Sequence, residues 1–148
     1  MTTVTPYAPA ALRDFLIGQP EFTNQVPVES VSTSDIPDKI TGPFVTLAAV
    51  SNFGQDPMLR KPLVQLDVWV PKWEILGGDI APDELAWNIA DLSGRLVHKA
   101  RIQRFRDTQS SWRATWDEGP ITDVDTERGP DLPLFRAICR FEMKFTVR

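Results

Sequence analysis

The chain has one cysteine and one histidine, the two residue types that could together form a nucleophilic pair. His98 lies near the end of a predicted helix, beside Arg95 and Lys99, whereas Cys139 lies on the apolar side of a predicted strand. A cysteine on an apolar face usually behaves as a small buried hydrophobe. We therefore expect Cys139 to be a core residue and not part of a catalytic pair.

The same two residues cannot supply the ligands of an ordinary zinc site. Asp123, Asp125 and Glu127 have the spacing that opens a calcium-binding loop. Arg128, however, occupies the position of the turn glycine, and Leu134 occupies that of the bidentate glutamate. A solvated acidic loop is the better interpretation. The sequence has no phosphate loop, nucleophile elbow or dinucleotide-binding motif either, so we expect no catalytic, cofactor-binding or metal-binding residues.

Two stretches of opposite charge remain as candidates for a functional surface. The first contains five basic residues and no acidic one: Arg95, Lys99, Arg101, Arg104 and Arg106. The second contains six acidic residues and one arginine: Asp117, Glu118, Asp123, Asp125, Glu127, Asp131 and Arg128. A solvated helix end and a solvated loop are the simplest interpretations. Alternatively, the two stretches pair head to tail between neighbouring subunits and close a ring.

Composition and charge narrow the class of protein. A length of 148 residues fits one domain over residues 1–148. The net charge of −4 and the pI near 5.0 disfavour binding of nucleic acid by overall electrostatic attraction. The basic stretch also lacks the interleaved aromatic residues of a nucleic-acid surface, apart from Phe105. One cysteine excludes a disulfide within the chain. We see no secretion signal and no apolar run near the about 18 residues of a membrane span, so we expect synthesis in a cytoplasm.

Hydrophobic periodicity predicts an α+β fold, with a mixed or antiparallel sheet of about four main strands and two helices packed on it. The strands are predicted at Pro43–Val50, Pro62–Val70, Ser111–Glu118 and Leu134–Arg148. One helix is predicted over Ala8–Ile17, and a second begins near Pro82 and carries an apolar stripe of Leu85, Ile89, Leu92 and Leu96. Gly94 lies inside the second helix, so we expect its far end to fray. Residues Glu21–Gly42 are predicted to be an extended arm or ordered loop.

Two of these strands alternate clearly between apolar and polar side chains, which is typical of a sheet with one face on a core and one toward water. In the second strand the apolar side consists of Val64, Leu66, Val68 and Val70. In the last it consists of Phe135, Ala137, Cys139, Phe141, Met143, Phe145 and Val147. Trp69 falls on the polar side, and we favour packing in the core or under a loop over a role as interface anchor.

Taken in order, these segments resemble the tail terminator family of long-tailed bacteriophages. The matching segments are ALRDFLIGQPEF, VPVESVSTSDIPDKITGPFVTLAAV, PLVQLDVWV, APDELAWNIADLSGRLV and GPDLPLFRAICRFEMKFTVR. The resemblance spans nearly the whole chain. It rests on the order of the elements and on phrases such as PFVTL and VQLDVWV, and the family has no catalytic motif to compare.

The resemblance implies a structural virion protein and not an enzyme. Such a subunit assembles as a hexameric ring at the head-proximal end of the tail, after synthesis in the host cytoplasm. The ring caps the completed tail tube, stops tube polymerisation and provides the interface for head attachment. The implied partners are further copies of the chain, the tail tube protein and the head–tail connector protein. Neither a cofactor nor sequence-specific nucleic-acid binding is implied.

Long loops would then make the contacts: the one after Gly18, the one over Asn52–Lys61 and the one over Gly119–Pro133. Asp56, Arg60 and Lys61 are candidates for contacts with the tube or the connector. Two alternatives remain open. One is another head–tail connector or tail completion protein of similar fold. The other is a small α+β enzyme or ligand-binding domain that uses a pocket between helix and sheet.

Overall fold

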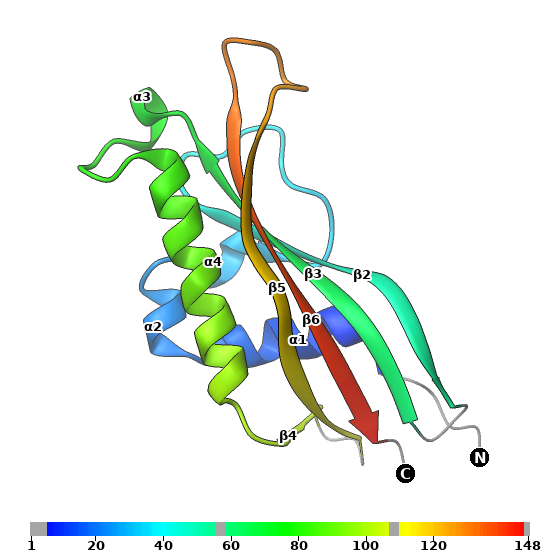
Figure 1. The fold of residues 1–148 in the computed structure, drawn as a ribbon. Coiled ribbons are helices and arrows are strands. Elements are labelled where there is room, and N and C mark those ends of the chain that lie inside the picture. The colour runs from blue at the N-terminus through cyan, green and yellow to red at the C-terminus, as the bar shows by residue number, and fades with distance from the viewer. Residues whose placement is uncertain (1–5, 56–58, 107–109, 147–148) are drawn as a thin grey trace.

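Six strands form one mixed sheet in the computed structural model, which describes residues 6–55, 59–106 and 110–146 (Figure 1). The strands are β1 (Val31–Ser32), β2 (Phe44–Gln55), β3 (Leu59–Pro71), β4 (Gln103–Arg104), β5 (Ser111–Asp125) and β6 (Leu134–Thr146). Their order is β1-β2-β3-β6-β5-β4, with β1 parallel to β2 and every other neighbour antiparallel. The predicted α+β class is confirmed, because four long strands build the sheet and two short ones extend it.

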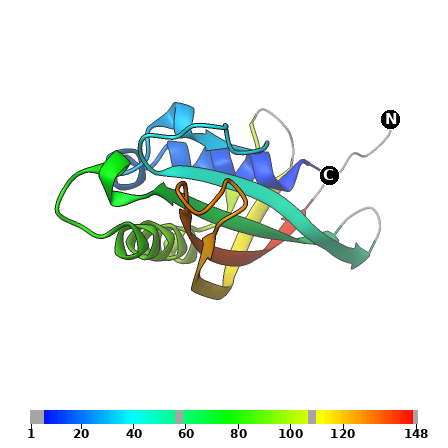
Figure 2. The same cartoon turned by 90° about the horizontal axis from the view of Figure 1, so that it is seen from above.

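Two helices, α1 (Ala8–Ile17) and α4 (Pro82–Lys99), pack on one face of this sheet (Figures 1 and 2). Leu12 and Leu16 of α1 are fully buried in the core, where α1 lies against β2 and β3, as their spacing predicts. The region predicted to be an irregular arm is more structured than expected. It contains α2 (Pro20–Thr23), the 3₁₀ turn Val28–Ser30 and β1, because Phe22 and Val26 are drawn into the core.

The predicted apolar stripe of α4 is only partly right. The residues that α4 buries are mostly small: Pro82, Ala86, Ile89, Ala90, Ser93, Gly94 and Val97. Leu85 and Leu96 lie at the margin of the core, and Leu92 is partly exposed. The helix approaches the sheet closely, which favours small side chains at the contact and displaces the leucines to its sides. The expected fraying at Gly94 is wrong, because α4 continues to Lys99.

The strands are longer than predicted, because two segments predicted to be loops continue the sheet. Residues 119–125 belong to β5, which passes through register shifts between Trp116 and Ile121. Gly119 has a positive φ of 100° at this bulge, and a Cβ there would lie 2.2 Å from the carbonyl oxygen of Ile138. The predicted loop over residues 52–61 is likewise shorter, since β2 runs to Gln55 and β3 begins at Leu59.

The second face of the sheet is covered at one end only. The alternation predicted for β3 and β6 is confirmed as far as Phe145, whereas Val147 and Arg148 of the predicted strand lie outside the described residues. Trp69 lies on the polar side. Trp69 is nevertheless 9% exposed, because residues 33–43 cross over it and contribute Ile36 and Ile40 to a small cluster with Phe44 and Leu134. Its indole Nε1 donates to Oγ1 of Thr46 at 2.9 Å. Trp69 therefore packs under a loop, as predicted.

Candidate interaction surfaces

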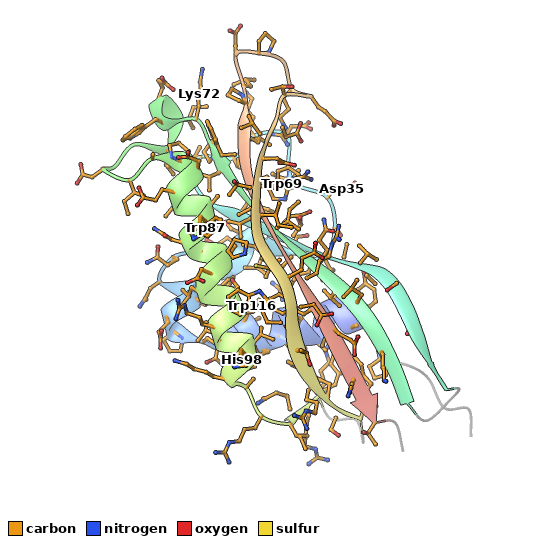
Figure 3. All side chains as sticks on the ribbon, viewed as in Figure 1. Asp35, Trp69, Lys72, Trp87, His98 and Trp116 are labelled. Carbon is orange, nitrogen blue, oxygen red and sulfur yellow. The ribbon has the colours of Figure 1, made fainter. Side chains whose placement is uncertain are left out.

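The predicted basic residues lie where the last turns of α4, marked by His98 in Figure 3, lead into β4. All five are exposed: Arg95, Lys99, Arg101, Arg104 and Arg106. Two of them are paired within the chain, Arg95 with Asp91 at 2.7 Å and Arg106 with Asp14 at 2.9 Å. Lys99, Arg101 and Arg104 form no ion pair within the described part of the chain, so the β4 end of the sheet presents uncompensated positive charge.

Three of the predicted acidic residues, Asp125, Glu127 and Asp131, lie at or near the connection between β5 and β6. This connection is at the opposite end of the sheet from β4, as Figure 1 shows. Asp123 lies nearby in β5 but binds Arg136, whose Nε donates to Oδ1 at 2.9 Å. Asp117 is exposed further along β5. The structure therefore does not bring the acidic and basic stretches together within one subunit.

Of the three candidates for tube or connector contacts, Asp56 is outside the described residues, and the other two lie in β3. Arg60 lies in β3, opposite Gly54 of β2 and Phe145 of β6. Lys61 is partly exposed in β3, opposite Phe53. The start of β3 lies at the same end of the sheet as β4 (Figure 1).

Between the two ends, the polar face of the sheet is bound together by its own side chains. Arg136 packs over the Trp69 ring at 5.1 Å and pairs with Asp123. Arg140 donates to Oε1 of Gln65 at 3.1 Å and contacts a carboxylate oxygen of Glu118 at 3.3 Å. Because the charges of Arg136 and Arg140 are largely paired within the subunit, this part of the sheet is a weaker candidate for a partner contact than the two ends.

Asp67 lies on the same polar face of the sheet and is partly buried. Its Oδ1 accepts a hydrogen bond from Nε2 of Gln65 at 3.0 Å, and Arg136 and Arg140 lie near enough to stabilise its negative charge. Burial nevertheless outweighs these contacts and raises the pKa of Asp67 above its ordinary value of 3.8. The folded state therefore disfavours the charged form of this carboxyl group.

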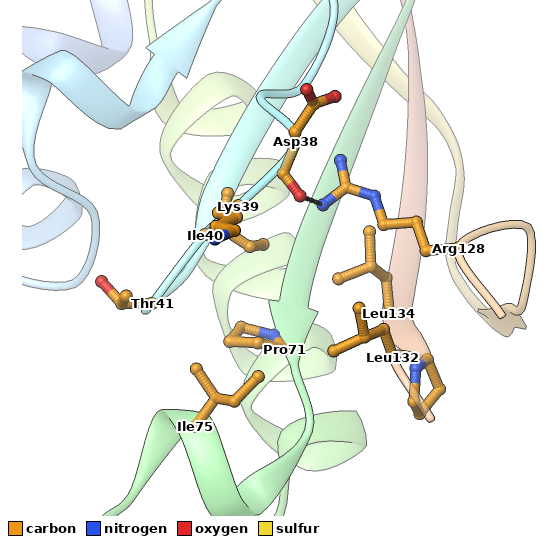
Figure 4. A pocket seen from close by; sticks show the side chains of 10 residues that line it. Asp38, Lys39, Ile40, Thr41, Pro71, Ile75, Arg128, Leu132 and Leu134 are labelled. Carbon is orange, nitrogen blue, oxygen red and sulfur yellow. Dashed lines mark hydrogen bonds between the residues drawn. The ribbon is translucent and has the colours of Figure 1, made fainter. Parts of the chain in front are cut away.

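An apolar cavity of about 250 Å³ opens at the end of the sheet where β5 connects to β6 (Figure 4). We call this the acidic end, because Asp125, Glu127 and Asp131 lie there. Its apolar walls come from residues 33–43, the end of β3, α3 (Trp73–Leu76) and the β5–β6 connection, namely Ile40, Pro71, Ile75, Leu132, Pro133 and Leu134. The Arg128 guanidinium donates to the carbonyl oxygens of Pro37 and Asp38 and ties two of these segments together. Sequence reasoning missed this pocket, because its residues are single apolar side chains in connections, without periodicity.

Cys139 and His98 are in different environments. Cys139 is fully buried, burial raises its pKa to about 12, and its Sγ donates to the carbonyl of Ala90 at 3.5 Å. His98 is exposed in the last turn of α4. Asp123 and Asp125 are engaged locally, by Arg136 and by the backbone N–H of Glu127. No group of three or more His, Cys, Asp or Glu side chains in the described residues could hold a metal ion.

No helix within residues 6–55, 59–106 and 110–146 is both long enough and apolar enough to cross a membrane. No protein-family model and no curated protein matches the sequence. Among solved structures, a chain from the virion of a native gene transfer agent (GTA) particle is similar. The alignment covers 92% of this chain and 93% of that chain, with a TM-score of 0.46 and 12% sequence identity. A similarity of this size does not assign a function to this chain.

Proposed function

We propose that this chain is a structural subunit that assembles head to tail into a ring and caps the tail tube of a bacteriophage. In this role the ring stops tube polymerisation and receives the head–tail connector. The observation that carries the assembly part is the separation of charge. Arg101 and Arg104 lie at one end and form no ion pair with any residue that the structure describes, whereas Glu127 and Asp131 lie at the other end. One subunit cannot bring these groups together, but two neighbours can.

A contact between unlike ends is heterologous, and it closes into a ring when its rotation divides a full turn. The resemblance to tail terminators supports six subunits and the position at the head-proximal end of a tail. The order on which that resemblance rests is helix, two strands, helix, two strands, and it recurs as α1, β2, β3, α4, β5 and β6. A symmetric ring also suits a symmetric tube end, because each subunit repeats the same weak contact.

The proposed partners are further copies of the chain, the tail tube protein and the connector protein. Asp56, Arg60 and Lys61 are the candidates for contacts with the tube or the connector, and the last two lie in β3. The ligand-binding alternative expects a pocket between helix and sheet. The apolar cavity lies at the end of the sheet, and its volume of about 250 Å³ is below the about 300–1,000 Å³ of typical ligand pockets. A second cavity of about 410 Å³, lined in part by Pro82 of α4 and Phe135 of β6, falls within that range, so volume alone does not decide against this alternative.

The decisive experiment removes the gene from the phage that carries it and examines the particles by electron microscopy. We expect tails of irregular and excessive length that fail to join filled heads. Adding the purified protein during tail assembly should restore both tail length and joining. Tails of normal length joined normally to heads in its absence would refute the terminator function.

A further inference from the structure

We propose that the exposed side chain of Ile102 inserts into the apolar pocket at the acidic end of a second copy of this chain, and that this contact forms the head-to-tail interface. The inference rests on the proposed ring and adds to it the surface by which neighbours join. Two complementary features carry it: an apolar projection within the basic end and an apolar cavity within the acidic end.

Ile102 is the projection. It is 67% exposed, more than any other large apolar side chain in the described part of the chain. It lies between the end of α4 and β4, directly after Arg101 and two residues before Arg104, and both arginines are exposed. Phe105, which is 8% exposed, anchors the segment in the core. A single exposed isoleucine is ordinary, but this one projects from an anchored segment and lies between two cations.

The cavity described above has the size and lining to receive such a side chain. At about 250 Å³ it holds one or a few side chains. Ile40, Ile75 and Leu132 contribute apolar surface at its walls, and Ile75 and Leu132 are themselves 40% and 46% exposed. Covering these side chains would remove apolar surface from water at both partners, which favours association.

The surroundings of the cavity are complementary in charge to those of Ile102. The charged residues that line the cavity itself are Asp38, Lys39 and Arg128. The longer segments that contain these three residues and Ile75, residues 35–41, 72–79 and 125–131, hold seven acidic and three basic residues, a net charge of −4. Residues 95–106 contain five basic residues and no acidic one. Two of the five are compensated by Asp91 and Asp14, which leaves a net charge of +3. Opposite potentials around an apolar contact select this partner and orient it.

A second copy is the occupant because each chain carries both halves of the contact and cannot join them internally. The Ile102 segment and the cavity lie at opposite ends of the sheet (Figures 1 and 4). Each subunit would therefore donate Ile102 to one neighbour and receive Ile102 from the other. The same contact then repeats around the ring without a second type of interface.

Disulfide trapping tests this contact directly, because the native protein has no exposed cysteine that would form cross-links of its own. Cys139 is the only native cysteine and is fully buried. We would mix Ile102→Cys with Leu132→Cys under mild oxidation and analyse non-reducing gels. A covalent dimer should form only in the mixture, and the variant with both cysteines should give a ladder up to the closed ring. Val28→Cys, at a 42% exposed position that belongs to neither the Ile102 segment nor the cavity, replaces Ile102→Cys in the control.

The same samples are examined by electron microscopy and sedimentation over a range of concentrations. Ile102→Asp should weaken assembly at least tenfold, whereas Val28→Asp should leave it within twofold, and circular dichroism checks that both fold. This inference would be overturned, but the proposed ring would not, if rings form without the cross-link between positions 102 and 132 or still form with Ile102→Asp. Absence of any oligomer and any cross-link at all concentrations would overturn the proposed ring together with it.

Discussion

The backbone of Gly94 in α4 lies directly against the indole of Trp116 in β5. A Cβ added at Gly94 would lie 2.5 Å from Cε2 of the ring, closer than real Cβ contacts allow. The ring is itself held in place, because its Nε1 donates to the carbonyl oxygen of Glu118 at 3.2 Å. The contact brings α4 close to the sheet and explains why α4 buries alanine, serine and glycine instead of its leucines.

Gly94→Ala should therefore destabilise the fold, although alanine is the better helix former by about 1 kcal/mol. Overpacking of this kind costs about 1–3 kcal/mol, so the free energy of unfolding in urea should fall. Asn88→Ala, at an exposed position of the same helix, is the matched control and should be neutral or slightly stabilising. Adding Trp116→Phe to Gly94→Ala should recover part of the loss. A variant as stable as the wild type would show that the contact is looser than described.

Asp67→Asn should stabilise the protein at neutral pH. Because burial raises the pKa of Asp67, the folded state binds a proton more tightly than the unfolded chain, and stability falls as pH rises from 3.8 through the raised pKa. An amide has no charge to bury and still accepts from Gln65. The gain should shrink as pH is lowered through the same window, and thermal unfolding at several pH values measures it. Lower stability of the variant at neutral pH would mean that Arg136 and Arg140 outweigh burial.

Cys139→Ala and His98→Ala test for hidden chemistry. Cys139→Ala should lose about 1 kcal/mol of stability, because a buried sulfur is removed. His98→Ala should lose almost none, since the side chain is exposed. Ring formation and tail capping should survive in both. In the wild type, the Cys139 thiol should resist alkylation at pH 8 until the chain unfolds, as its pKa of about 12 requires. Loss of function in a stably folded variant would revive the enzyme hypothesis.

Ring assembly should weaken as salt is added, because exposed charges at the two ends are screened. Arg104→Glu and Asp131→Lys should each weaken assembly, and the combined variant should regain part of the loss. Each exposed pair contributes only about 0.2–1 kcal/mol, but it recurs at every interface of a ring. Glu21→Lys, at an exposed position of α2 outside both charged stretches, is the control and should have a smaller effect. Assembly that is independent of salt and of these reversals would exclude the charged ends as the interface.

The sequence alone was enough to predict the α+β class, the four main strands and the face that each of β3 and β6 presents to the core. These features depend on local periodicity, since a period of two allows only one arrangement of Val64, Leu66 and Val68 about a buried face. The first helix followed in the same way from Leu12 and Leu16. The burial of Cys139 followed from its place on the apolar side of β6.

Tertiary structure decided what depends on contacts between distant segments. Leucine periodicity predicted the wrong centre for the buried face of α4, because the distance between helix and sheet is set by Gly94 and Trp116 together. The acidic loop became half strand, since β6 offers hydrogen-bond partners as far as Asp125. The apolar pocket and the separation of the charged ends arise only when the connections meet in space, and no local pattern records which connections will meet.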